Sequence, residues 1–141
     1  MAGIRPWTRG GAIVARASTR PLGRADEEIA ARFLRRRGLT IVERNLRSRL
    51  GEIDLVVRDG KTLVFVEVKA RRDAGGDPPQ AAVDGRKRMR LARLALGYLA
   101  GRRLAEAACR FDVVAVTVDD AGRAVGVTHF RDAFRADGWV G

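Results

Sequence analysis

The chain has 141 residues, 46% of them hydrophobic, and this size and composition are typical of one soluble domain with its own core. The sequence has no run of about 18 apolar residues, so it predicts no membrane-spanning helix. The formal net charge of +11 favours a polyanionic partner, nucleic acid first, although a compositional bias toward arginine can also raise the charge. The single cysteine, Cys109, excludes an internal disulfide, and we expect it in the core of a cytoplasmic protein.

Helical and strand patterns alternate along the chain after a segment without acidic residues at 1–22. We expect that segment to be a flexible basic tail and residues 23–141 to form one domain. The predicted ranges are, in chain order, a helix at 25–37, strands at 39–45, 52–57 and 62–69, a loop at 72–80, a helix at 81–101, strands at 110–118 and 123–128, and a short helix near 130–136. A strand meander followed by a helical crossover predicts an α/β fold with a mixed sheet and helices packed on it.

The first predicted helix has an apolar face and defined ends. Ile29, Phe33 and Leu34 recur at helical spacing. Acidic residues at 26–28 fall in the expected first turn, where the helix dipole favours anions. Gly38, which follows three arginines, is a typical C-terminal stop.

The strands at 52–57 and 62–69 are predicted to form a hairpin, because the two residues at 59–60 are Asp-Gly, a strong signal for a two-residue turn. In this register Asp54 lies opposite Phe65, and Glu52 lies opposite Glu67, a like-charge pair that needs a cation nearby. Side chains alternate across a strand, so one face of the hairpin is wholly apolar. The other face is apolar near the turn and charged at its far end.

The charged end of the hairpin is the candidate site. Asp54 and Glu67 are diagonal neighbours, on the order of 7–8 Å apart at the backbone, so their carboxylates can converge on one ion. Oxygen ligands suit Mg²⁺ or Mn²⁺, and such a metal polarises a phosphodiester and helps deprotonate water. Lys69 can orient that water or neutralise charge on the phosphate. The alternative is a solvated charged strand end, which the apolar neighbours of Glu67 disfavour, because charge on a central strand is costly unless paired or metal-bound.

The residues of this site also carry a family resemblance. The stretches at 51–55 and 65–71 resemble the YraN family of bacterial proteins, grouped with the Holliday-junction-resolvase-like branch of the PD-(D/E)xK, or restriction-endonuclease-like, nuclease superfamily. The resemblance covers about residues 23–118 and implies a restriction-endonuclease-like mixed β-sheet core flanked by helices, and so a nuclease-like domain. Ile53 stands where the superfamily has proline, so the sequence specificity of restriction enzymes does not carry over.

The resemblance also implies a role for each matching residue. Asp54 and Glu67 correspond to metal ligands, and Lys69 corresponds to the catalytic lysine. Glu27 corresponds to the helix-borne acid that completes the metal shell in resolvase-like members. Glu28 is the alternative residue for this role if the alignment is shifted by one position. The alternative for Glu27 is a residue that only complements the helix dipole.

Positive charge concentrates on the second predicted helix. Between Gly85 and Arg103 there are seven basic residues and no acidic residue. Lys87 corresponds, by resemblance, to a phosphate contact, with a solvated helix face as the alternative. The candidate nucleic-acid-binding residues are Lys87, Arg86, Arg88 and Arg90.

Three further residues receive weaker interpretations. By resemblance, Gln80 matches a position that some nucleases use near the site. Asp112 is expected to have a structural role beside Arg110. His129, the only histidine, is expected to be an ordinary surface residue at the end of an edge strand, which disfavours a histidine-based nuclease or a zinc site.

The leading functional prediction is a Mg²⁺-dependent endonuclease that hydrolyses phosphodiester bonds in DNA, with branched or flapped structures as candidate substrates. One alternative is a nucleic-acid-binding module that keeps the site without catalysis, and another is an adaptor in DNA repair or uptake. Resolvase-like enzymes often act as dimers, so the resemblance also leaves a homodimer open.

Overall fold

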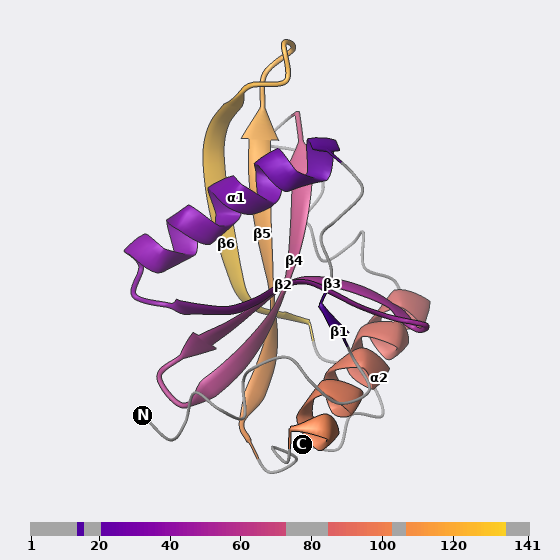
Figure 1. Ribbon diagram of the computed structural model, residues 1–141. Coiled ribbons are helices and arrows are strands. Elements are labelled where there is room, and N and C mark those ends of the chain that lie inside the picture. The colour runs from indigo at the N-terminus through magenta and orange to yellow at the C-terminus, as the bar shows by residue number, and fades with distance from the viewer. Residues whose placement is uncertain (1–13, 16–20, 73–84, 103–106, 135–141) are drawn as a thin grey trace.

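The structure, a computed structural model, describes residues 14–15, 21–72, 85–102 and 107–134. Their helices and strands, labelled as in Figure 1, are β1 (Val14–Ala15), α1 (Pro21–Arg36), β2 (Thr40–Ser48), β3 (Gly51–Asp59), β4 (Thr62–Arg71), α2 (Gly85–Gly101), β5 (Cys109–Val118) and β6 (Ala124–Phe134).

The six strands form one mixed sheet in the order β1-β2-β3-β4-β5-β6. Neighbouring strands are antiparallel except β4 and β5, which run parallel because the segment that contains α2 carries the chain back across the sheet. The sheet twists strongly, so that β2 and β3 run across the direction of β5 and β6 in Figure 1. The predicted α/β fold with a mixed sheet and two packed helices is confirmed, and it is consistent with a restriction-endonuclease-like architecture.

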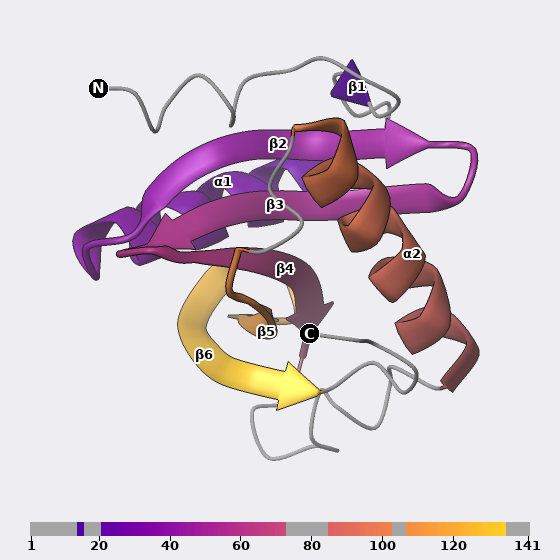
Figure 2. The ribbon, with the colours of Figure 1, turned by 90° about the horizontal axis from the view of Figure 1, so that it is seen from below.

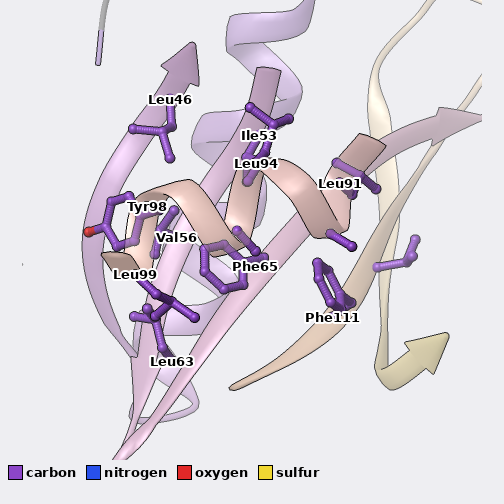
Figure 3. Packing of buried hydrophobic residues seen from close by; sticks show 13 residues of the cluster. Leu46, Ile53, Val56, Leu63, Phe65, Leu91, Leu94, Tyr98, Leu99 and Phe111 are labelled. Atoms are coloured by element: carbon purple, nitrogen blue, oxygen red, sulfur yellow. The ribbon is translucent and has the colours of Figure 1, made fainter. Parts of the chain in front are cut away.

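The two helices cover opposite faces of the sheet (Figure 2). Ala30 and Leu34 of α1 pack with Val64 of β4. On the other face, Tyr98 of α2 meets Phe65 edge-on at a centroid distance of 5.9 Å, within the cluster that Figure 3 shows. Val64 and Phe65 are neighbours whose side chains point to opposite faces, so β4 is buried on both sides.

The hairpin between β3 and β4 has a register that differs from the prediction. Asp59 pairs with Thr62, so the two loop residues are Gly60 and Lys61. Gly60 adopts a φ of 61°, the left-handed conformation that a two-residue loop requires. Because this change of register keeps odd-numbered and even-numbered residues of each strand on the faces predicted for them, the predicted faces are correct near the turn. At the far end Ile53 lies instead in the core on the α2 side.

Near the C-terminal end of the described residues lies a strand where we expected a short helix. The prediction of a helix near 130–136 is wrong, because β6 continues to Phe134. Phe130 packs against the core on the α2 side. Asp132, at a φ of 50°, donates its backbone N–H to Asp112 Oδ1 at 2.8 Å. Pairing with β5 therefore decides the conformation of this segment.

The first helix starts earlier than predicted. α1 begins at Pro21, a residue that suits the first helical position because it has no N–H to satisfy. The acidic residues at 26–28 therefore lie beyond the first turn, where the dipole argument no longer applies. Within the expected tail, Val14–Ala15 pairs with Arg47 and Leu46 as β1, and the boundary at residue 22 falls inside α1. The remaining tail residues lie outside the described ranges.

The interpretation of His129 as a surface residue is wrong. Its side chain is only 3% exposed, and its Nε2 lies 2.7 Å from Oδ2 of the fully buried Asp112. Asp112 also accepts a hydrogen bond from Arg110 Nε at 3.0 Å, in agreement with the structural role expected for it beside Arg110. Arg110 in turn donates to Asp59 at 2.9 Å. These four side chains tie β3, β5 and the edge strand β6 together.

Three smaller expectations can be compared with the described residues. Cys109 packs half-buried against the core on the α2 side, and burial raises the pKa of its thiol to about 11, which is typical of an unreactive cysteine. Gln80 and Arg103 lie outside the described ranges. None of the helices in those ranges has the length and apolar character needed to cross a membrane.

Candidate metal site

Three acidic side chains from α1 and β3 meet beside the sheet. Glu27, Glu52 and Asp54 each place a carboxylate oxygen within 4.8 Å of the other two. Glu27 and Asp54 are buried, at 5% and 7% exposure, and Glu52 is half-buried. Because buried carboxylates repel one another, such a group favours a shared proton or a bound cation.

The geometry of β3 and β4 explains where this group forms. The antiparallel pairs run from Asp59 back to Leu55, which pairs with Val66, and β4 then bends away from β3 (Figure 2). Beyond the last pair, Asp54 Oδ2 accepts the backbone N–H of Val68 at 2.8 Å. A side chain thus takes the place of a ladder hydrogen bond, and Asp54 does not lie opposite Phe65 as predicted.

Asn45 on β2 links two of the acids. With its amide nitrogen facing the carboxylates, it donates to Glu27 Oε1 at 2.7 Å and to Glu52 Oε2 at 3.1 Å. Its φ of 53° lies in the left-handed region, which Asn tolerates better than most residues. Arg47 Nε also lies 3.7 Å from Glu52. These donors orient the carboxylates and offset part of their repulsion.

Asp54 is the most strongly perturbed member of the group. Burial, followed by the negative charge of Glu67, raises its pKa from 3.8 to about 7, and Glu27 and Glu52 add to the effect. The hydrogen bond from Val68 acts in the opposite direction. A carboxyl group in this state gives up its proton readily when a divalent cation is available. Perturbation of this kind is typical of functional sites.

Glu67 on β4, the second predicted metal ligand, is paired with a lysine of α2. Lys87 Nζ lies 2.6 Å from Glu67 Oε2. The negative charge of Glu67 raises the pKa of Asp54, but Glu67 is not one of the three acids whose carboxylate oxygens lie within 4.8 Å of one another. Helix α1 thus carries Glu27 of the acidic group, while α2 holds Glu67 through Lys87. Lys87, which the sequence assigned to a phosphate, contacts a carboxylate in this structure.

The remaining site predictions concern Lys69 and the choice of helix acid. Lys69 is half-buried on β4, two residues beyond Glu67 and on the same face by strand alternation. Glu28 accepts a hydrogen bond from Arg44, which lowers the pKa of Glu28. Glu27, and not Glu28, belongs to the acidic group.

The basic side chains of α2 differ in how far they are exposed. Arg86 and Arg90 are exposed, and Arg88 is half-buried. A Cβ on Gly51 would lie only 3.0 Å from Arg90 Cδ, so the stem of Arg90 covers the start of β3. Arg102, which we counted with the same basic helix, is 7% exposed and does not belong to the solvent-facing stripe.

The structure adds two residues that sequence reasoning did not assign to the site. Glu52 was noted only as a like-charged partner of Glu67, yet its spacing of two residues from Asp54 already placed both on one face of a strand. Asn45 gave no such signal, because its role depends on a left-handed backbone and on the docking of α1. Strand spacing alone could therefore have predicted Glu52 as a member of the acidic group, but not Asn45.

The family model described as "Uncharacterised protein family UPF0102" matches residues 26–116. A UPF0102 protein of Geotalea uraniireducens (strain Rf4) is 45% identical over 119 residues, which are 84% of this chain and 93% of that protein. Another, of Moorella thermoacetica (strain ATCC 39073 / JCM 9320), is 49% identical over 112 residues, which are 79% and 93% of the two chains. The solved structure of Pyrococcus furiosus SfsA in complex with Ca²⁺ matches 85% of this chain and 66% of that chain, with a TM-score of 0.36 and 18% identity. The chain belongs to the uncharacterised protein family UPF0102, in agreement with the YraN resemblance of its sequence.

Proposed function

We propose that the protein is a metal-dependent endonuclease of the PD-(D/E)xK superfamily that hydrolyses phosphodiester bonds in DNA. The observation that carries the proposal is the group of Glu27, Glu52 and Asp54, two of them buried and one half-buried, whose carboxylate oxygens lie within 4.8 Å of one another. A surface patch would not need burial or shared hydrogen-bond donors. A cation-binding function accounts for both, because the cation offsets the desolvation and repulsion of the acids.

The donor set fits a hard divalent cation. Carboxylate oxygens are the ligands that Mg²⁺ and Mn²⁺ prefer in proteins. Asp54, Glu27 and Glu67 would hold the ion, and the carboxylate of Glu52 would be available as a further ligand. When bound, such an ion lowers the pKa of a water molecule and neutralises charge on a phosphodiester.

Two lysines of the chain have separate tasks in this proposal. Lys69 places its ammonium group beside the phosphate that is cut, where negative charge develops during hydrolysis. Lys87 holds Glu67 by an ion pair at 2.6 Å. A cation among the acids competes for that carboxylate, and Lys87 can then turn to a phosphate, the contact that the sequence resemblance implies.

The charge of the molecule supports a nucleic-acid substrate. The chain carries a net charge of +11, and Arg86, Arg88 and Arg90 stand on the helix that reaches the site. Contacts from arginine to phosphate position a backbone but carry little base information. We therefore propose branched or flapped DNA, recognised by shape, as the substrate class.

The test is cleavage of a panel of linear, flapped and branched DNA molecules in Mg²⁺ or Mn²⁺. Glu27→Gln and Glu28→Gln form a matched pair on neighbouring positions of α1, and only Glu27 belongs to the acidic group. We expect Glu27→Gln and Glu67→Ala to reduce the cleavage rate by about 100-fold or more, as is typical for loss of a metal ligand or its support. Glu28→Gln should retain the rate of the unaltered protein.

Two outcomes would contradict the proposal. If the unaltered protein binds DNA in a salt-dependent manner but cleaves no member of the panel with either metal, the chain is a nucleic-acid-binding module. If it shows no salt-dependent DNA affinity, the adaptor interpretation replaces both.

A further inference from the structure

Arg71 ends β4 on the face that carries Glu67 and Lys69. Side chains two residues apart on a strand point to the same side, so Arg71 lies one step beyond Lys69, roughly 7 Å along the strand. Its guanidinium carbon lies 5.8 Å from the centroid of the Phe130 ring. That separation is within the range of a cation–π contact.

The platform beneath Arg71 is fixed by the fold. Phe130 packs against the core on the α2 side, and its strand, β6, pairs with β5 at Val113. Arg71 itself pairs in parallel register with Thr117 of β5. Backbone pairing and an aromatic surface therefore restrict the guanidinium, so it loses little further freedom when it binds a ligand.

One polar atom of Arg71 is not satisfied. Its Nε is buried, and no group among the described residues accepts a hydrogen bond from it. A buried cationic donor without an acceptor costs free energy. The nearest acid along this face of β4, Glu67, is engaged by Lys87.

These observations define what would satisfy Arg71. The planar guanidinium fork matches two oxygens of a phosphate better than a single ammonium does. We propose that Arg71, oriented by Phe130, binds a DNA phosphate next to the one at Lys69. This inference rests on the proposed nuclease function. It assigns Arg71 as the residue that positions the DNA strand along β4.

The experiment measures the binding of a fluorescein-labelled flapped DNA by anisotropy at increasing KCl concentrations, with Ca²⁺ in place of Mg²⁺. Arg71→Gln should lower the salt slope, d log K/d log[KCl], by about 0.7–0.9 in magnitude, because one phosphate contact is lost. Arg71→Lys keeps the charge and should keep the slope, while the loss of the fork weakens binding about tenfold. Phe130→Leu should weaken binding with an unchanged slope. The control is Arg36→Gln, an exposed arginine of α1 on the opposite face, which should leave affinity and slope as in the unaltered protein.

Circular dichroism of each variant separates loss of binding from loss of fold. If Arg71→Gln does not fold, the binding measurement with Arg71→Lys tests the inference. If Arg71→Gln and Arg71→Lys bind DNA as the unaltered protein does, while the unaltered protein still cleaves in Mg²⁺, this inference is overturned and the proposed function stands. If the unaltered protein binds no DNA at any salt concentration, both are overturned.

Discussion

Asp54 has an environment that opposes its own ionisation. It is buried beside Glu27, Glu52 and Glu67, and burial together with these charges raises its pKa to about 7. In the unfolded chain the same group ionises near its ordinary pKa of 3.8. The folded protein therefore takes up a proton here that the unfolded protein does not bind. The resulting stability is fully present below about pH 4 and is lost as the pH rises through about 7.

Asp54→Asn should stabilise the protein in EDTA at about pH 8. Asparagine removes the charge and still offers an oxygen to the N–H of Val68, which Asp54 accepts at 2.8 Å. The melting temperature should rise by several degrees at about pH 8, and the gain should shrink at about pH 5, where the carboxyl is already protonated. Thermal melts at both pH values test this. Glu28→Gln, which removes an acid outside the group, should give no such gain, and a loss of stability in Asp54→Asn at about pH 8 would contradict the expected repulsion.

At the scale of the strand, Gly51 lets the start of β3 lie close to the side chains of Arg90 and Leu94 on α2. Its φ of 137° is unfavourable for any residue with a side chain, and a Cβ there would approach Arg90 Cδ to 3.0 Å. Gly51→Ala should cost about 2 kcal/mol in the free energy of unfolding, measured by urea denaturation. Gly60→Ala is the control, because Gly60 has a φ of 61° and a Cβ added there would meet nothing within 4 Å, so that the substitution costs about 1 kcal/mol. Equal losses would contradict the larger cost expected at Gly51 from its φ and its approach to Arg90.

The edge of the sheet depends on a second element-scale contact, the Asp112 network. Burial alone would raise the pKa of Asp112, but hydrogen bonds from His129, Arg110 and the backbone of Asp132 lower it overall. Its contribution to stability is therefore present above about pH 4 and is lost as the pH falls through the lowered pKa. Asp112→Asn should cost about 3–5 kcal/mol, because it leaves the largely buried guanidinium of Arg110 without the charge of this partner.

The control for that variant is Asp120→Asn in the exposed turn before β6, which should change the free energy of unfolding by less than about 0.5 kcal/mol. Urea denaturation of the two variants compares them directly. A cost for Asp112→Asn as small as that of the control would mean that the network does not hold β6 in place.

For the whole molecule, hydrophobic periodicity predicted the order of the elements from α1 to β6 and the faces near the β3–β4 turn, but not the strand β1 or the continuation of β6 in place of a short helix. Alternation cannot detect a change of register that keeps odd and even positions on their faces, so the loop residue Lys61 was missed. The burial of His129 could not be predicted, because its partner Asp112 is 17 residues away and only strand pairing joins them. Asn45 was missed because its contacts depend on where α1 docks.

The molecule also combines opposite charges in a way that composition alone does not reveal. A chain with a net charge of +11 gathers three acidic side chains of α1 and β3 at one point, two of them buried. Of the basic residues of α2, Lys87 forms an ion pair with Glu67 on β4. A divalent cation would join the acids to a phosphate that the basic residues also attract, which is why cation binding is the central claim.

Calorimetric titration of Mn²⁺ into the full chain tests that claim most directly. We predict one ion bound per chain at about pH 8, release of protons on binding, and affinity at least about tenfold weaker at about pH 6, since Asp54 must then lose its proton. Asp54→Asn should abolish this binding, and Glu28→Gln should preserve it. Absence of binding by the unaltered protein, or equal binding by Asp54→Asn, would contradict the claim.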